Sequence, residues 1–121
     1  SDLYTIPYVI PVQQSTQVTV TWNTSSSTVI DNAAIDSLAT PDLQDYINSL
    51  GPGQYINFYE MQYIFQEAVV DIIPTPLITH IEFSVTVNGQ ALTPAVNTGV
   101  VVGDPEGYYY ATTADITFVR G

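Results

Sequence analysis

The amino-acid sequence predicts an α+β fold with two layers, in which two or three short helices pack on one face of a mostly antiparallel sheet of about four strands. Apolar residues recur at helical spacing between residues 28 and 69. Alternating apolar and polar residues lie before and after this region, and an Asn-Gly pair ends one of the alternating runs. Helices grouped together between strands are typical of helices packed against one sheet face.

The chain has 121 residues, which is enough for one hydrophobic core. We expect a single domain over residues 16–121. Residues 1–15 contain Pro7 and Pro11, which remove backbone donors, so this segment is expected to be an extended arm or connector. The chain does not begin with Met, and we expect it to be a fragment of a longer chain.

The first predicted strand is residues 17–22, where Val18, Val20 and Trp22 alternate with polar residues. Residues 23–28 are a polar loop by composition. Residues 28–39 have helical spacing, and a break is predicted near Thr40. Thr40 would then cap a new helix that begins at Pro41.

The predicted helix from residue 41 carries an apolar stripe and ends at Gly51-Pro52-Gly53. A further helix is predicted over residues 57–69, with Met61, Ile64, Phe65 and Ala68 on one face. Residues 71–76 form a Pro-punctuated link. Residues 81–87 alternate as a strand, and Asn88-Gly89 is the favoured two-residue hairpin turn. Residues 90–107 are expected to be irregular, with residues 99–102 as the one candidate for a short strand, and strands are expected near residues 108–112 and 114–119.

The charge balance excludes some classes of partner. Twelve acidic residues stand against one basic residue, Arg120, and the formal net charge is −11. Nucleic acids and anionic membranes are bound mainly through Lys and Arg, so we expect neither as a partner. The chain has no Cys, which removes disulfides, thiolate catalysis and Cys-ligated zinc.

The sequence offers weak candidates for catalysis or metal binding. His80 is the only His and has no nucleophile motif to serve. Glu60, Glu67 and Glu82 could supply paired carboxylates for glycoside hydrolysis, but their spacing is also that of solvated side chains. Residues 104–107 have too few acids for a calcium loop and are predicted to form a turn. We therefore expect no enzyme activity, no metal and no cofactor.

Tyrosine is the other prominent feature, with nine residues in the chain. Tyrosine is enriched at protein interfaces and on sugar-stacking surfaces. On a strand, Tyr109 would face away from its two neighbours. The candidate interface residues are Tyr108, Tyr109, Tyr110, Tyr4, Tyr8 and Tyr59.

Several motifs together resemble the C-terminal domain of the phage baseplate J-like family. They are Val18, Val20 and Trp22, the segment Asp45–Gly51, Ile56, the segment Met61–Ile64, and the segment Phe83–Gly89. The resemblance covers roughly residues 12–90. It implies a structural subunit of a contractile-tail baseplate, located in the virion and assembled in the host cytoplasm. Its partners would be other baseplate or tail proteins, as an oligomer in the assembled particle, and no catalytic residues are carried over.

Two other functions remain open at this point. A carbohydrate-binding or adhesive module of a virion or secreted surface protein would use exposed tyrosines to stack on sugar rings. A small glycosidase-like enzyme would use Glu60, Glu67 or Glu82.

Overall fold

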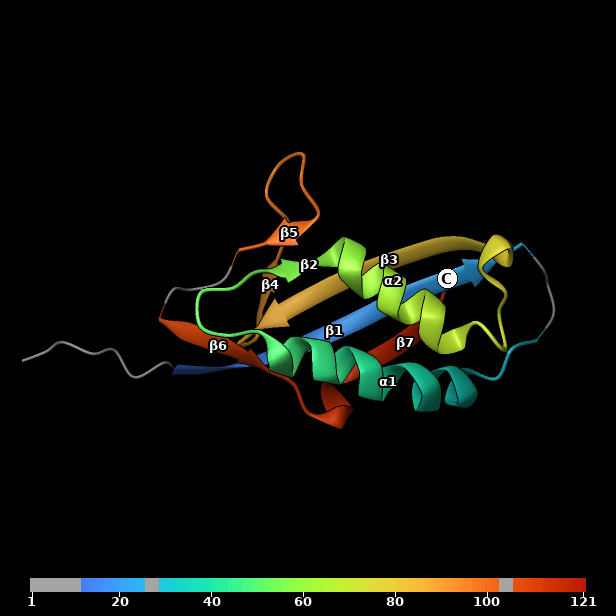
Figure 1. Cartoon of the computed structure of the whole chain (residues 1–121), viewed down its shortest axis with the longest axis horizontal. Coiled ribbons are helices and arrows are strands. Elements are labelled where there is room, and N and C mark those ends of the chain that lie inside the picture. Colours follow the sequence, from blue (N-terminus) through green and yellow to red (C-terminus); the bar gives the residue numbers. More distant parts are fainter. Residues whose placement is uncertain (1–11, 26–28, 103–105) are drawn as a thin grey trace, which may run out of the picture.

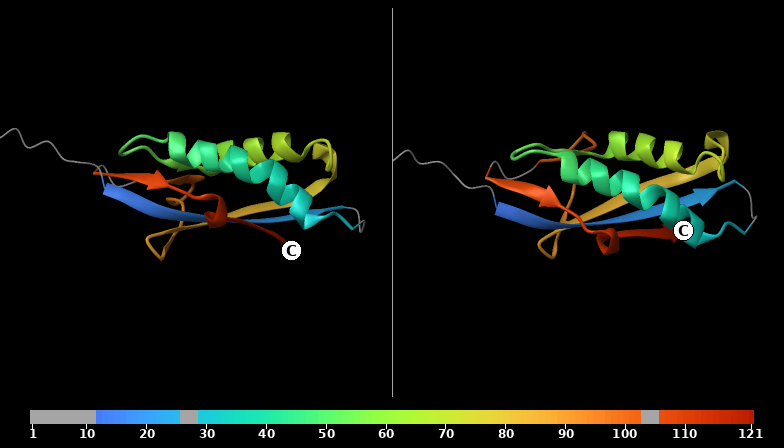
Figure 2. Two further views of the ribbon diagram at one scale, coloured as in Figure 1. Left: turned by 90° about the horizontal axis from the view of Figure 1, so that it is seen from below. Right: turned by 60° about the horizontal axis from the view of Figure 1, so that its bottom comes forward.

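The computed structural model describes residues 12–25, 29–102 and 106–121. Within these ranges, helices α1 (Asn32–Ser49) and α2 (Phe58–Val69) lie together over one face of a five-stranded sheet (Figures 1 and 2). The sheet contains β1 (Val12–Thr24), β3 (Ile78–Val87), β4 (Gln90–Leu92), β6 (Gly107–Tyr110) and β7 (Ile116–Arg120). Outside it are the strands β2 (Ile56–Asn57) and β5 (Val100–Val101), which pair with each other, and the short helices η1 (Thr75–Leu77) and η2 (Thr113–Asp115). The predicted α+β class is confirmed.

Strand β1 is the centre of the sheet. On one edge it pairs antiparallel with β3, which in turn pairs with β4. On the other edge it pairs in parallel with β6 and then with β7. The strands after the helices were predicted to be antiparallel, and this holds for β3 and β4 but not for the pairing of β6 and β7. The chain crosses from β4 to the far edge of β1, where β6 and β7 run in the same direction as β1.

Strand β1 is longer than the sequence predicts. Residues 12–15, predicted as part of the N-terminal arm, pair with β6 as the first residues of β1. Residues 1–11 lie outside the described residues. Residues 23 and 24 extend β1 into the predicted polar loop, of which residues 26–28 also lie outside the described part.

The predicted helix break at Thr40 is wrong, because α1 runs without interruption through Pro41. The N-cap is Asp31, whose side chain accepts from the Ala33 N–H. Thr40 is buried, and its hydroxyl donates to the Asp36 carboxylate at 2.7 Å. Burial of Ile35 and Leu43 on the two sides of Pro41 holds one helix together despite the hydrogen bond that Pro cannot make.

The predictions for α2 and the hairpin are confirmed. Helix α2 begins after its N-cap Asn57, whose side chain accepts from the Tyr59 N–H. Asn88 and Gly89 have φ angles of 50° and 80°, the left-handed values that a two-residue hairpin of this type requires. Neither helix in the described part of the chain is long and apolar enough to cross a membrane.

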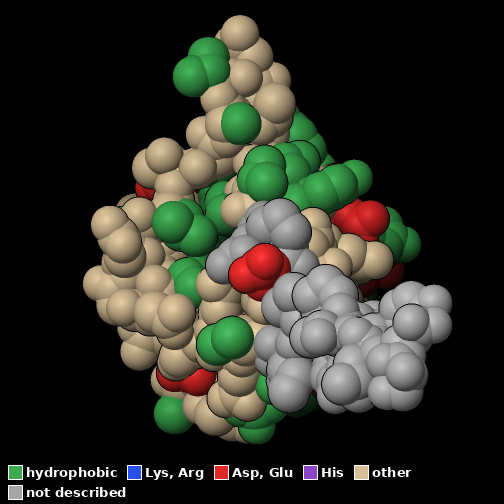
Figure 3. Space-filling view, turned by 90° about the vertical axis from the view of Figure 1, so that its left-hand side faces the viewer, with side chains coloured by type: hydrophobic (Ala, Val, Ile, Leu, Met, Phe, Trp, Pro, Cys, Tyr) green, Lys and Arg blue, Asp and Glu red, His purple; other side chains and the backbone are tan. Residues whose placement is uncertain are grey.

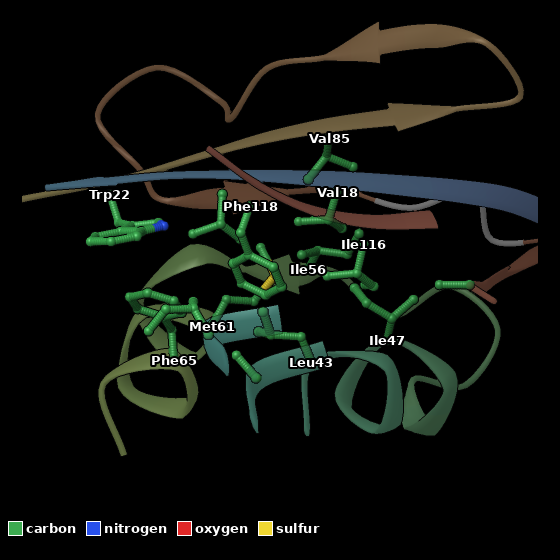
Figure 4. Close-up of a cluster of buried hydrophobic side chains, with 14 of the residues drawn as sticks. Val18, Trp22, Leu43, Ile47, Ile56, Met61, Phe65, Val85, Ile116 and Phe118 are labelled. Atoms are coloured by element: carbon green, nitrogen blue, oxygen red, sulfur yellow. The ribbon is translucent and has the colours of Figure 1, made fainter. Parts of the chain in front are cut away.

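The hydrophobic core fills the space between the sheet and the two helices (Figure 4). Even-numbered residues of β1 face the helices, and among them Val18, Val20 and Trp22 are fully buried or nearly so. On the opposite side of the core, α1 contributes Leu43, α2 contributes Met61, and both add other apolar side chains (Figure 4). The Phe65 and Phe118 rings stack at 5.8 Å between centroids. These contacts fix how the helical layer sits on the sheet.

Asn48 joins α1 to the segment between β6 and η2. Its side-chain amide donates to the Ala111 carbonyl at 3.0 Å, and its oxygen accepts from the Ala111 N–H at 2.8 Å. Ala111 is fully buried. A buried backbone N–H needs a partner, and in this structure Asn48 supplies it.

Replacing Asn48 with Ala is expected to lower the free energy of unfolding by about 1–3 kcal/mol, because the Ala111 N–H loses its partner inside the protein. The Ala111 carbonyl retains Gln44 as a donor. Urea unfolding followed by circular dichroism measures the change. Ser49→Ala is the control, because the exposed Ser49 hydroxyl bonds only within its own helix. Equal stability of the Asn48 and Ser49 variants would contradict this role for Asn48.

Candidate interaction surface

The predicted interface tyrosines lie in different places. Tyr4 and Tyr8 are outside the described residues. Tyr109 pairs with Gln14 on the helix side of the sheet and is only 3% exposed. Tyr109 is therefore a core residue, which corrects its prediction as an interface residue. Tyr108 and Tyr110 alternate with it and face the opposite side of the sheet. Tyr108 is half-buried, with its hydroxyl 3.3 Å from the Gln13 side-chain oxygen, and Tyr110 is exposed.

Three exposed tyrosines lie on α2 or in the segment just before it, and we call them the tyrosine surface: Tyr55, Tyr59 and Tyr63. Tyr59 and Tyr63 are four residues apart on α2, so they lie on one side of the helix. They are 69% and 64% exposed. The inner stripe of α2 is filled by Met61 and Phe65, which leaves the two tyrosines facing outward. Of these three residues, only Tyr59 was predicted as an interface residue, although the same helical spacing also indicates Tyr63.

The position of Tyr59 is set by the start of α2 and by Gly99. The Phe58 N–H donates to the Gly99 carbonyl at 2.7 Å, which attaches the segment before β5 to the helix. A Cβ atom at Gly99 would lie 2.6 Å from the Tyr59 ring. Gly99 therefore allows the Tyr59 ring to lie directly against the backbone. This contact orients one side of the tyrosine surface.

Two open hollows adjoin the tyrosine surface. One, of about 420 Å³, is lined by Tyr59, Glu60, Tyr63 and Ile64. The other, of about 450 Å³, lies between the end of α1 and the start of α2, and its lining includes Tyr46, Gln54, Tyr55 and Glu60. Figure 3 shows this end of the molecule, with hydrophobic side chains beside acidic ones and no basic side chain in view among the coloured atoms. The surface thus combines aromatic rings with hydrogen-bonding groups.

Tyr46 forms the inner wall of the larger hollow. Its hydroxyl oxygen accepts from the Asn57 N–H at 2.9 Å, which ties α1 to the start of α2. Burial raises the pKa of the Tyr46 phenol above 10.0, and the nearby Glu60 carboxylate and Tyr55 raise it further, whereas the bond from Asn57 lowers it. The neutral phenol is therefore favoured in the folded protein.

The Tyr46 phenol should make stability depend on pH in alkaline solution. Its pKa is higher in the folded state than in the unfolded state, so its contribution is complete below pH 10 and is lost as pH rises through the folded pKa. We expect the free energy of unfolding to fall above pH 10, and to fall less steeply in Tyr46→Phe. Urea unfolding at pH 8–11 tests this. Parallel curves for the two proteins would show that Tyr46 makes no such contribution.

The three glutamates considered for catalysis are not brought together. Glu60 and Glu67 lie about 10 Å apart along the axis of α2, from the helical rise per residue. Glu82 is exposed on the sheet, where its carboxylate Oε2 lies 3.7 Å from the His80 Nε2 atom. Among the described residues, no group of three His, Asp or Glu side chains could hold a metal ion. Of the turn predicted at residues 104–107, residues 104 and 105 lie outside the described part.

Comparisons with known families and curated proteins found no match. No protein-family model matches the chain, and no curated protein matches it.

Proposed function

We propose that the chain is a structural subunit domain of a phage tail baseplate, which joins neighbouring subunits and has no catalytic role. The observation that carries this proposal is the tyrosine surface. Tyrosine offers a large apolar area with few rotatable bonds and a polar end, and it is enriched at protein interfaces. Two adjacent tyrosines, each about two-thirds exposed on one helix, are well suited to a partner surface.

The resemblance to the phage baseplate J-like family supports the choice of assembly. The resembling segment Asp45–Gly51 ends α1, and the segment Phe83–Gly89 contains the second half of β3 and the hairpin turn. These segments determine the fold rather than a reaction. The proposed partners are other baseplate or tail proteins in the virion, assembled in the host cytoplasm.

Immunogold electron microscopy would test the location. Antibodies raised against the purified chain would be applied to tail particles from the organism that encodes it. Labelling at the baseplate end of the tail is the expected result. Intact tails that carry no label at that end, while the antibody still recognises the purified chain, would reject the proposal.

A paired variant tests the tyrosine surface itself. Tyr59→Ser with Tyr63→Ser is expected to lower incorporation of the chain into tail particles at least tenfold, measured by quantitative immunoblot of purified particles. The matched control is Tyr110→Ser, which removes an exposed tyrosine from the other side of the sheet. Equal incorporation of all three proteins would show that assembly uses another surface.

The larger hollow favours a second candidate function, a carbohydrate-binding or adhesive module. Its Tyr55 ring could stack on a sugar, and Gln54 and Glu60 could bond to sugar hydroxyls. This function predicts binding on a glycan array that Tyr55→Ala weakens at least tenfold and Tyr110→Ala leaves unchanged. An array without binding would remove this candidate and leave the assembly function standing.

A further inference from the structure

Strand β3 has an open outer edge over most of its length. On its inner edge β3 pairs with β1 from Ile78 to Val87. On its outer edge β4 covers only residues 85–87. No other strand in the described part of the chain pairs with residues 78–84 on this side. Figure 1 shows β4 beside one end of β3 only. A sheet edge of this kind can accept an additional strand.

The register shows which backbone groups point outward. The Asn88 N–H donates to the Ser15 carbonyl at 2.8 Å, so even-numbered residues of β3 bond to β1. The odd-numbered residues Ile81 and Phe83 therefore direct their N–H and C=O groups toward the open edge, whereas the register shifts at Thr79. The side chains of Ile81 and Phe83 face the helices but stay only half-buried, whereas Val85 and Val87, beside β4, are buried.

An apolar groove runs beside this edge. It has a volume of about 350 Å³, and its lining includes Phe58 and Tyr59 from α2 and Ile81 and Phe83 from β3. The Phe58 and Phe83 rings are 5.8 Å apart. The one charged residue among the described residues that line the groove is Glu82. A strand added at the edge would therefore place its inward side chains among aromatic and aliphatic groups.

We propose that this edge binds residues 3–10 of a second copy of the chain, added to β3 as a further strand. The segment Leu3–Ile10 is largely apolar and has no charged residue, so no acidic side chain of the segment itself would lie against the edge. Tyr4, Ile6, Tyr8 and Ile10 alternate along it and would share one side of a strand. Apolar side chains from this side of the strand would enter the groove beside Ile81 and Phe83.

The two prolines of the segment are compatible with this strand. Pro7 and Pro11 are both odd-numbered, so in an extended strand their nitrogen atoms point away from the edge that the even-numbered residues use. Ile6, Tyr8 and Ile10 keep the N–H groups that would bond to β3. Proline is tolerated on an edge strand when its nitrogen faces outward. The other side of the added strand would be interrupted by the prolines, which limits further strand addition.

The donor must be another copy, because the segment cannot reach this edge in its own chain. The segment is joined to Val12, where β1 begins, whereas Phe83 lies opposite Val20 of β1. Val12 and Val20 are eight residues apart along the strand, which is a distance of about 26 Å. Ile6, Tyr8 and Ile10 are at most six residues from Val12 and so stay within about 22 Å of it. The N–H groups of these three residues can therefore pair with Ile81 and Phe83 only in a neighbouring copy.

The test is self-association of the full chain in 0.15 M NaCl, measured by light scattering over a range of concentrations. The average molar mass of the wild-type protein is expected to rise with protein concentration. Ile6→Pro removes an N–H aimed at β3 and should weaken association at least tenfold. Val9→Pro removes an N–H aimed away and should change association less than threefold. Both substitutions lie outside the described sheet, and circular dichroism would check that the fold is intact.

Amide hydrogen exchange by NMR gives a second readout on the accepting strand. The Ile81 and Phe83 amides should be protected in concentrated wild type and exchange rapidly in Ile6→Pro. A wild type that stays monomeric at millimolar concentration would overturn the proposal. Association and amide protection that survive Ile6→Pro would also overturn it, and would indicate pairing of two β3 edges instead. The proposal does not depend on the baseplate assignment, because it concerns only this edge and this segment.

Discussion

Replacing Phe65 with Ala is expected to lower the free energy of unfolding by about 3–5 kcal/mol. The Phe65 side chain is fully buried on α2 and stacks on Phe118 of β7, so its removal opens a cavity between the helical layer and the sheet. A loss of this size is a large part of the 5–15 kcal/mol that is typical of a folded domain. The variant should remain folded at low temperature but unfold at much lower urea concentration.

Urea unfolding of Phe65→Ala beside Tyr63→Ala gives the measurement and its control. Tyr63 lies two residues away on the same helix but is largely exposed, so its removal should cost less than about 0.5 kcal/mol. Similar losses in the two variants would mean that α2 does not present Phe65 to the core as described.

Replacing Pro41 with Ala is expected to raise the free energy of unfolding by about 2 kcal/mol. Pro41 lies inside α1, where it has no N–H for the Ser37 carbonyl and its ring crowds that carbonyl. Proline in a helix interior is about 3 kcal/mol less favourable than alanine, and some of this cost is relieved by adjustment of the helix. The Pro41 side chain is exposed, so the substitution leaves the core unchanged.

The measurement is again urea unfolding, with Pro52→Ala as the control. Pro52 lies in the turn after α1, where proline restricts the unfolded chain without interrupting a helix, so its replacement should give no stabilisation. A Pro41→Ala protein no more stable than wild type would show that the helix around Pro41 already satisfies the Ser37 carbonyl in another way.

Pro41 also shows where local sequence signals reach their limit. The central part of β1, most of β3, the Asn88-Gly89 turn and helix α2 were predicted correctly, because each follows from the pattern of its own residues. Thr40-Pro41 has the local pattern of a helix start, yet burial of Ile35 and Leu43 in the same core makes one continuous helix more favourable. The parallel pairing of β6 and β7 depends on where the chain crosses the sheet, which no local pattern specifies.

The tyrosines show the same division between pattern and packing. Alternation along β6 correctly separates Tyr109 from Tyr108 and Tyr110, but alternation alone does not say which side faces the helices. Only the pairing with β1 places Tyr109 in the core. On α2, helical spacing was enough to predict the buried positions of Met61 and Phe65.

The central place of β1 has a consequence for the making of the protein. The first element of the described chain finds its nearest partner in sequence only at Ile78, 54 residues beyond Thr24. At 5–20 residues per second, a ribosome needs several seconds to produce this stretch. During that interval Val18, Val20 and Trp22 have no sheet to join. The nascent chain must keep an apolar strand from premature association until its C-terminal half has emerged.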